Sequence, residues 1–246
     1  MKLFTAPNRA PRTHKLFHYI KYLGIEYASD INEASLIMYY DITLDAIFTL
    51  PDVLKNRNDV INKGLKSVRK DEVEKVFNNV FGYSSLVNPL THKACCIEKS
   101  LRNAVHDGKI VQCPIKPKEG KVYQKLVDTR IKHNTLKDIR VVVMKDEIPQ
   151  VFVKEFTTNV MFTHSPSSTD ARIENPSLQL SKDEIIKILQ FSSDMNLEFG
   201  ELDVLRSNET GRLYIVDVNP TPGYGLLKMV EGSTAIMAEH FKRIFL

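Results

Sequence analysis

Residues 201–223 of this 246-residue chain read ELDVLRSNETGRLYIVDVNPTPG, a pattern typical of two β-strands joined by a tight turn. The first half is rich in aliphatic residues, and the second half is rich in β-branched and aromatic ones. The polar residues 207–211 between them are common turn residues. The sequence therefore predicts a β-hairpin here, and Pro220 ends its second strand.

Three side chains of this hairpin carry oxygen ligands. Asp217 and Asn219 share one face of the second strand, because successive side chains alternate between faces. If Arg206 pairs with Arg212, Asp203 of the first strand lies on that face too, diagonally beside Asp217. Hard oxygen donors without His or Cys suit Mg²⁺ that is shared with substrate phosphates. We therefore predict that these three residues bind Mg²⁺; the simpler alternative is a surface hairpin with two solvated carboxylates.

A second motif lies upstream of the hairpin. Residues 94–99 predict a strand that ends at Lys99, residues 100–108 a polar loop, and residues 109–113 the returning strand. A lysine beside a small polar loop can bind phosphate, with the ammonium group on one side and backbone N–H groups on the other. The alternative is an ordinary exposed lysine on a strand.

Two further strands carry basic residues. Residues 138–144 begin with Asp-Ile-Arg and place Arg140 early in the strand, and residues 149–155 return with Lys154 near the end. Two such cations can neutralise the charge that develops on a phosphoryl group during its transfer. Surface ion pairs are the plain alternative for both residues.

The order of these motifs between residues 81 and 225 resembles that of the ATP-grasp superfamily. In that family a lysine strand, a flexible loop and a returning strand precede a hinge, a basic strand pair and a metal-binding hairpin. The resemblance implies an α/β fold in which two lobes clasp ATP behind a small N-terminal α/β domain. Asp203, Asp217 and Asn219 match the family's metal ligands, although glutamate is more usual at the position of Asp217.

The resemblance also implies how ATP binds. Residues 122–128 are similar to the family's hinge, whose backbone groups pair with adenine, and Asp128 would hold the ribose hydroxyls. Arg140 and Lys154 would act as catalytic residues on the transferred phosphoryl group. The expected contacts with ATP are Lys99, Ser100, Asn103, His106, Gln124, Lys125, Leu126, Asp128, Arg140 and Lys154.

Three domains follow from this assignment. Residues 1–80 form the N-terminal α/β domain, residues 81–155 the small ATP-grasp lobe, and residues 156–246 the C-terminal lobe with the metal site. A phosphate-contacting lysine is expected near the end of the first domain, where Lys63 and Lys66 are equal candidates.

Three arginines are candidates for substrate binding. Arg9 and Arg12 lie in the loop after the first predicted strand, at the carboxyl edge where open α/β sheets bind ligands. A solvated loop is an equal alternative. Residues 156–179 are polar and irregular in pattern, and long loops of this kind are commonly functional. We expect them to cover the substrate, with Arg172 as their strongest anion contact.

The composition is ordinary for a soluble globular protein, with 43% hydrophobic and 26% charged residues. Lys and Arg are spread along a chain of net charge +4, which argues against nucleic-acid binding. No apolar run reaches the length that crosses a bilayer, so no membrane partner is expected. The three cysteines show neither a disulfide framework nor a zinc spacing, which favours a reducing cytoplasm.

The resemblance to the ATP-grasp superfamily implies an ATP- and Mg²⁺-dependent carboxylate–amine ligase, peptide-like in its chemistry, that acts through an acyl phosphate. Mn²⁺ is an alternative metal. The expected partners are a small-molecule carboxylate and an amine or other acceptor. Two alternatives stay open: an ATP-grasp kinase that phosphorylates a small molecule, and a nucleotide-binding regulatory module without turnover. The sequence does not identify the carboxylate, the acceptor or the oligomeric state.

Overall fold

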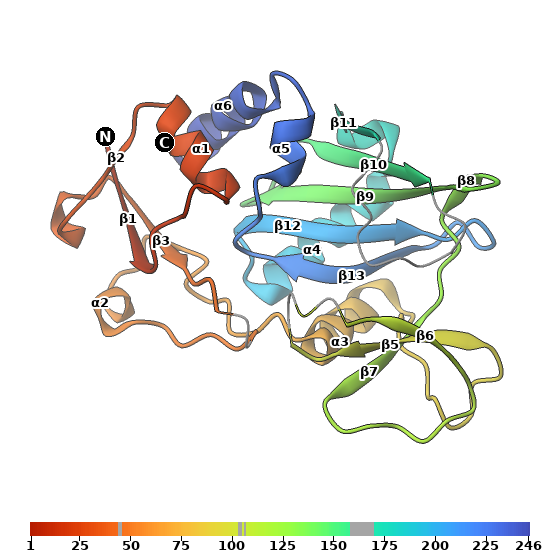
Figure 1. The fold of residues 1–246 in the computed structure, drawn as a ribbon. Coiled ribbons are helices and arrows are strands. Elements are labelled where there is room, and N and C mark those ends of the chain that lie inside the picture. The colour runs from red at the N-terminus through yellow and green to blue at the C-terminus, as the bar shows by residue number, and fades with distance from the viewer. Residues whose placement is uncertain (44–45, 103–104, 106, 158–169) are drawn as a thin grey trace.

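The computed structural model describes residues 1–43, 46–102, 105, 107–157 and 170–246, which form three β-sheets and the helices that cover them (Figure 1). The N-terminal sheet lies at one end of the molecule, the largest sheet in the middle, and the smallest sheet below the largest one in this view. This mixed arrangement confirms the α/β fold class that the sequence predicts.

The N-terminal domain is a parallel sheet of four strands in the order β2-β1-β3-β4. Its helix α1 packs Leu16, Tyr19 and Ile20 into the same core as the C-terminal helix α6 (Ser233–Phe245). This sheet and its helices lie within residues 1–80, where the sequence predicts a small N-terminal α/β domain. The elements are β1 (Lys2–Pro7), α1 (Lys15–Tyr22), β2 (Glu26–Tyr27), η1 (Ile31–Glu33), β3 (Leu36–Tyr40), α2 (Asp52–Lys55) and β4 (Val60–Ile61).

The central sheet is antiparallel and has six strands. Five follow the order β11-β10-β9-β12-β13, and β8 pairs with β9. The predicted hairpin supplies β12 and β13, and the Asp-Ile-Arg segment lies in β9. The strands are β8 (Arg130–Lys132), β9 (Thr135–Met144), β10 (Val151–Thr157), β11 (Asp170–Glu174), β12 (Phe199–Arg206) and β13 (Leu213–Asn219).

The two faces of the central sheet differ in polarity. One face buries side chains such as Val141, Val153 and Leu202 under α3 (Lys70–Phe81) and α4 (Lys182–Met195). The opposite face is apolar at one end, where α1, α5 (Gly225–Met229) and α6 share a core with Val142 and Phe152. At its other end this face carries charged side chains, which leaves that end available for a polar ligand.

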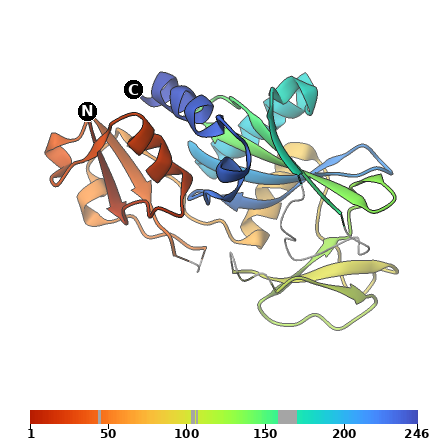
Figure 2. The same cartoon turned by 45° about the horizontal axis from the view of Figure 1, so that its top comes forward.

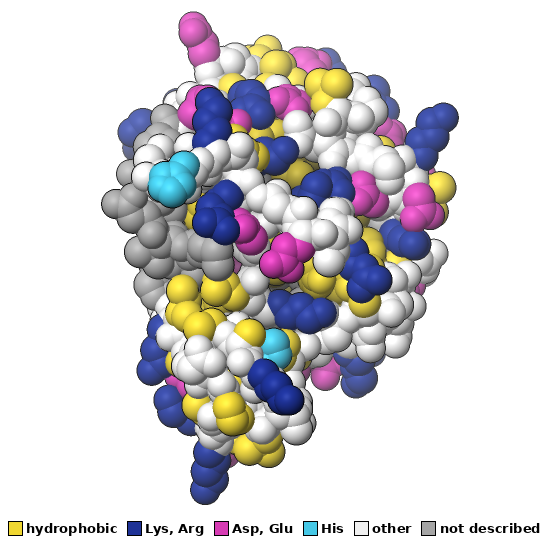
Figure 3. Space-filling model, turned by 90° about the vertical axis from the view of Figure 1, so that its right-hand side faces the viewer, with side chains coloured by type: hydrophobic (Ala, Val, Ile, Leu, Met, Phe, Trp, Pro, Cys, Tyr) yellow, Lys and Arg dark blue, Asp and Glu magenta, His cyan; other side chains and the backbone are white. Residues whose placement is uncertain are grey.

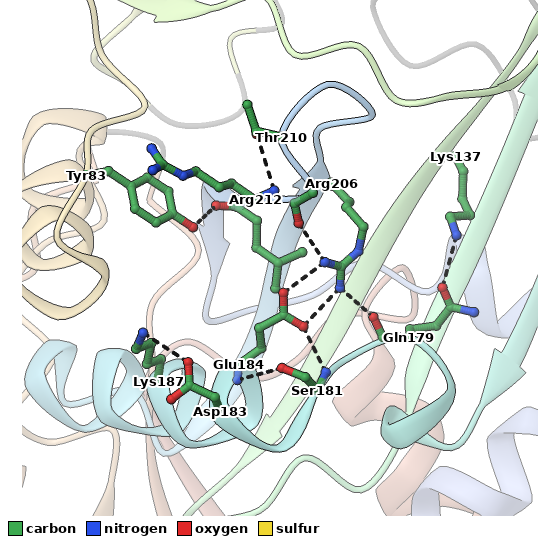
Figure 4. Close-up of polar contacts among 12 residues, drawn as sticks. Tyr83, Lys137, Gln179, Ser181, Asp183, Glu184, Lys187, Arg206, Thr210 and Arg212 are labelled. Atoms are coloured by element: carbon green, nitrogen blue, oxygen red, sulfur yellow. Dashed lines mark hydrogen bonds and ion pairs between the residues drawn. The ribbon is translucent and has the colours of Figure 1, made fainter.

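Helix α4 is anchored to the end of β12 through Glu184. Ser181 and Glu184 form the capping box that begins α4. Arg206 of β12 donates hydrogen bonds to both carboxylate oxygens of Glu184, at 2.8 and 3.0 Å, and to the carbonyl of Gln179 at 2.7 Å (Figure 4). A bidentate contact of this kind fixes both distance and orientation.

The smallest sheet has three strands in the order β6-β5-β7, with all pairs antiparallel. Its strands are β5 (Cys95–Ser100), β6 (Lys109–Gln112) and β7 (Lys121–Lys125). The predicted strand that ends near Lys99 and its returning strand are therefore confirmed. Both views show this sheet on the side of α3, away from the N-terminal sheet (Figures 1 and 2).

The prediction of an irregular segment over residues 156–179 is wrong for residues 170–174. These residues form β11, which pairs with β10 at the edge of the central sheet, and η2 (Pro176–Leu178) follows. Arg172 donates to Glu155 at 2.6 Å and to Glu174, so partners across and along the strands favour an extended chain. Residues 156 and 157 of the expected loop belong to β10, and residues 158–169 lie outside the described residues.

The pairing of the strands can be compared with the expected boundary between the two ATP-grasp lobes. The expected boundary between residues 155 and 156 falls inside β10, and β10 pairs with β9, which in turn pairs with β12. The strands β9 and β10 therefore belong to the same sheet as the hairpin, and the separate small sheet comprises β5 to β7.

Charged side chains are mixed on the surface. In the upper and right-hand parts of Figure 3, Lys and Arg side chains lie among acidic ones. In the described part of the chain, every helix falls short of the length and apolarity that a membrane span requires.

One asparagine side chain connects the N-terminal domain to the start of β12. Asn62 follows β4 and has a positive φ of 61°. Its Oδ1 accepts from the N–H groups of Glu198 and Phe199 at 2.8 and 2.9 Å, and its Nδ2 donates to the Phe199 carbonyl at 2.8 Å. Its own N–H donates to the Glu198 carboxylate at 2.8 Å. One side chain thus satisfies three backbone groups at the start of β12.

We expect Asn62→Ala to lower the free energy of unfolding by about 2–4 kcal/mol, because it removes the partner of three backbone groups, two of them buried, and places alanine at a positive φ. Urea denaturation of the purified variant measures the loss. Asn58→Ala, at an exposed position of the same segment, is the matched control and should change stability by less than about 0.5 kcal/mol. Equal stabilities of the two variants would contradict this role.

Candidate functional site

The β12–β13 hairpin forms with a register different from the predicted one. Asp203 pairs directly with Asp217, and the register shifts between Asp203 and Val204, so that Arg206 pairs with Leu213 and not with Arg212. The shift is a β-bulge, an extra residue in one strand. Directly opposed residues of two paired strands share a face of the sheet, so Asp203 and Asp217 lie together as predicted.

Two more residues of the hairpin lie on this face. Asn219 is opposite Glu201, and these residues are two positions from Asp217 and Asp203 along their strands. The structure therefore places the three predicted metal ligands together and adds a carboxylate, Glu201, that the sequence analysis misses. An acidic residue two positions from Asp203 in an otherwise apolar strand is the signal that could have revealed it.

The strands β9 and β10 bring two cations beside Asp203. Arg140 lies opposite Asp203 and donates Nε and Nη2 to its carboxylate at 2.8 and 2.6 Å. Lys154 Nζ lies 3.5 Å from Asp203 and 3.7 Å from Asp138. Both predicted catalytic residues are therefore at the site, and Asp138 is a further acidic member that the sequence analysis does not single out.

A lysine that the sequence analysis misses lies beside Asp217. Lys70, the first residue of α3, is 8% exposed, and its Nζ is 3.6 Å from Asp217 Oδ1. Of the two lysines proposed from the sequence, Lys63 donates to the Lys55 carbonyl at 3.0 Å, and Lys66 is exposed. A cation at a helix N-terminus is electrostatically unfavourable, and this is the signal that could have identified Lys70.

Lys99 reaches the same region from the smallest sheet. It lies at the end of β5, and its ammonium group interacts with the charges of Asp217, Lys70 and Asp203. Burial lowers the pKa of Lys99, and the nearby carboxylates oppose this effect. The candidate site is therefore bounded by the charged end of the central sheet and by the face of the smallest sheet that carries Lys99.

The two opposed aspartates have shifted pKa values of opposite sign. Burial raises the pKa of Asp217, the neighbouring charge of Asp203 raises it further, and Lys70 and Lys99 oppose the shift. Burial also acts to raise the pKa of Asp203, but Arg140 and Lys154 outweigh it and hold that pKa well below its usual range. Asp203 is therefore a stable anion, and Asp217 is the less fully compensated carboxylate.

The donor set fits a hard divalent cation. Asp217 Oδ1 is buried and has no hydrogen-bond partner among the described residues, and Asp203 and Asn219 add oxygen donors on the same face. Within the described residues, no group of three or more His, Cys, Asp or Glu side chains could hold a metal by itself. Two carboxylates and one amide therefore suit Mg²⁺ that takes its other ligands from phosphate and water.

Three of the predicted contacts with ATP lie on β7 or directly after it. Gln124 lies on the same face of the smallest sheet as Lys99, is 4% exposed, and has an Oε1 without a hydrogen-bond partner among the described residues. Leu126 is half-buried, and Lys125 Nζ lies 5.4 Å from the ring of Tyr214. Gln124 therefore has an acceptor that a ligand can satisfy.

Other residues predicted to contact ATP already have hydrogen-bond partners or lie outside the described residues. The Asp128 carboxylate accepts from Arg130 Nε at 2.9 Å, and the Ser100 N–H donates to Asp107 at 2.9 Å. Asn103 and His106 lie outside the described residues.

The three arginines proposed for substrate are spread over two sheets. Arg9 lies 5.0 Å from the centre of the Tyr27 ring in the N-terminal domain, and Arg12 is exposed. Arg172 is on β11, where Glu155 and Glu174 hold its guanidinium. The described structure does not bring these three side chains together.

No protein-family model matches this chain, and no curated protein is significantly similar to it in sequence. Several solved structures resemble it. The ATP-grasp ligase PsnB, complexed with minimal precursor, Mg and ADP, aligns with a TM-score of 0.62 at 9% identity, over 98% of this chain and 97% of that one. In another alignment, with PsnB bound to minimal precursor, this chain spans 63% of that chain.

Two other similar structures also contain peptides. The macrocyclase MdnC, bound with precursor peptide MdnA from Microcystis aeruginosa MRC, aligns with a TM-score of 0.56 at 10% identity, over 98% of this chain and 99% of that one. The RiPP-associated ATP-grasp ligase of Chryseobacterium gregarium, in complex with ADP and a leader and core peptide, aligns with a TM-score of 0.53 at 13% identity, over 98% and 96%.

These likenesses show that the chain has the ATP-grasp fold, as the order of its motifs predicts. They also correct the expected partners. The expected partners, a small-molecule carboxylate and an amine, are wrong for the similar proteins, which are bound to precursor peptides.

We expect Asp217→Asn to leave the melting temperature of the ligand-free protein unchanged or higher at pH 7. Because the folded pKa of Asp217 is raised, the native state holds its proton more tightly than the unfolded state. The stability from this proton is present at low pH and is lost as pH rises through the folded pKa. Asn cannot ionise, so the variant does not lose this stability as pH rises. The difference in melting temperature between the variant and the wild type should therefore shrink toward about pH 4.

Calorimetry across this pH range measures the difference. Asp146→Asn, at an exposed turn position, is the matched control. A lower melting temperature of Asp217→Asn at pH 7 would show that the contact with Lys70 outweighs the cost of burying the carboxylate.

Proposed function

We propose that this protein is an ATP- and Mg²⁺-dependent ligase that joins a carboxylate of a peptide to an amine. The observation that carries the proposal is the convergence of four basic side chains on three oxygen donors between two sheets of an ATP-grasp fold. The basic residues are Lys70, Lys99, Arg140 and Lys154, and the oxygen donors are Asp203, Asp217 and Asn219.

The basic residues have separate tasks in this proposal. Lys99 and Lys70, which interact most strongly with the charge of Asp217, bind the phosphates of ATP. Arg140 and Lys154 stabilise the negative charge on the phosphoryl group as it is transferred. Asp203, Asp217 and Asn219 would hold Mg²⁺, which when bound neutralises phosphate charge. The open acceptor of Gln124 would accept a hydrogen bond from the amino group of adenine.

The chemistry requires no nucleophile from the protein. A carboxylate oxygen of the substrate attacks the γ-phosphorus of ATP, ADP leaves, and an acyl phosphate forms. The amine nitrogen then attacks the acyl carbon, phosphate leaves with the bonding electrons, and the nitrogen loses a proton. The protein's part is to position the reactants and to stabilise negative charge.

The peptide nature of the substrate rests on the comparisons. PsnB, MdnC and the Chryseobacterium ligase are all bound to precursor peptides or parts of them. We therefore propose that both the carboxylate and the amine belong to a peptide, so that the product is a cross-linked or cyclised peptide.

The reaction can be tested with synthetic peptides that contain Glu and Lys side chains. With ATP and Mg²⁺ we expect ADP release together with a peptide product lighter by one water. Hydroxylamine, a small nucleophile, should trap the acyl phosphate as a hydroxamate. A phosphorylated peptide that is stable to hydroxylamine would indicate a kinase, and ATP binding without ADP release across the peptide set would indicate a regulatory module.

We expect Lys99→Ala to weaken ATP binding by about 1.5–3 kcal/mol, the value of a hydrogen bond to a charged group. Titration calorimetry of the folded variant measures this loss. Lys116→Ala, at an exposed position of the same small lobe, is the matched control and should bind ATP like the wild type. Equal affinities of Lys99→Ala and the control would remove Lys99 from the phosphate site.

A further inference from the structure

A buried ion pair joins the N-terminal domain to the charged face of the central sheet. Lys15 is the first residue of α1, and Glu201 lies on β12, two residues from Asp203. Their side chains are 0% and 1% exposed, and Lys15 Nζ donates to Glu201 Oε1. The ammonium group also lies 4.1 Å from the centre of the Phe152 ring. Removal of two charges from water is unfavourable, so stability alone is a weak reason for such a pair.

The backbone fixes the position of Lys15. Its N–H donates to the Pro222 carbonyl at 2.9 Å, and the Tyr224 N–H donates to the Thr13 carbonyl at 2.7 Å. The ring of His18 stacks on Tyr224 with 3.4 Å between centroids. The start of α1 is therefore held against the segment that leaves β13, directly after the proposed metal ligands.

The second oxygen of Glu201 faces Arg140. Glu201 Oε2 lies 3.6 Å from Arg140 Nη1 and, among the described residues, has no hydrogen-bond partner. Arg140 uses Nε and Nη2 for Asp203. The guanidinium therefore stands between two carboxylates. It is hydrogen-bonded to Asp203, while Lys15 neutralises Glu201.

We propose that Lys15 is a positioning residue that orients Arg140 by neutralising Glu201, so that the N-terminal domain sets the geometry of the nucleotide site. This inference rests on the proposed function, in which Arg140 contacts the phosphates of ATP. Without the ammonium group of Lys15, the carboxylate of Glu201 would be buried without compensation beside Nη1. It would then draw the guanidinium away from Asp203 and from the phosphate.

The test compares Lys15→Met with the double variant Lys15→Met/Glu201→Gln. Lys21→Met, at an exposed position of the same helix, is the matched control. For each folded variant, titration calorimetry gives the Kd for ATP with and without Mg²⁺, and thermal unfolding gives the Tm. We expect Lys15→Met to bind ATP about tenfold more weakly, the size of one lost charge-assisted contact.

The double variant should recover affinity to within about threefold of the wild type, because the neutral amide of Gln no longer competes for Arg140. The control should bind ATP like the wild type. In steady state, the same order should hold for the KM of ATP. If Lys15→Met does not fold, Lys15→Gln replaces it, since its amide can still donate to Glu201 but carries no charge.

Two results would overturn the inference while the proposed function stands. One is wild-type affinity for ATP in the folded Lys15→Met or Lys15→Gln variant, which would leave Lys15 with a purely structural role. The other is equal loss of affinity in the single and double variants, which would show that Lys15 does not act through Glu201. Failure of the wild-type protein to bind ATP would instead overturn the proposed function itself.

Discussion

The central constraint on this structure is the burial of carboxylates on one face of a β-hairpin. Glu201, Asp203 and Asp217 lie on neighbouring strands, and their side chains are between 1% and 25% exposed. Buried carboxylates are unfavourable unless cations or hydrogen-bond donors compensate them. Five different elements supply those cations: α1, α3, β5, β9 and β10.

Charge compensation of this kind links the site to the assembly of the whole molecule. The cation of α1 comes from the N-terminal domain, and the side chain of Asn62 binds that domain to the start of β12. Lys99 comes from a third sheet that pairs with neither of the others. The charged site therefore exists only when the three sheets are packed together, because α1 of the N-terminal domain, the central sheet and the smallest sheet each contribute a positive charge to it.

Cations compensate the two aspartates of the hairpin unequally, and this difference indicates which ligand the site favours. Asp203 is held by two cations and has a lowered pKa, whereas Asp217 has a raised pKa and an oxygen without a hydrogen-bond partner among the described residues. An anion that is short of positive charge favours an incoming cation. The basic side chains at the site outnumber the carboxylates, and this excess of positive charge favours binding of a polyanion. A complex of Mg²⁺ with a nucleotide triphosphate meets both requirements.

Much of the fold and part of the site follow from the sequence alone, because they depend on interactions between residues close together in the chain. Strand alternation places Asp217 and Asn219 on one face, turn residues predict the hairpin, and Ser181 with Glu184 predicts the start of α4. The order of such local motifs was enough to indicate the ATP-grasp fold.

The tertiary structure alone decided the register and the partners. The bulge beside Asp203 places it opposite Asp217, and a bulge leaves no clear mark in a pattern of alternating side chains. Lys15 and Lys70 meet carboxylates that lie far along the chain, and no local pattern specifies which carboxylate each one compensates. Both lysines begin a helix, where a positive charge is locally unfavourable. The sequence therefore marks these two positions as unusual for lysine, and only the packing of the three sheets determines which carboxylate each one meets.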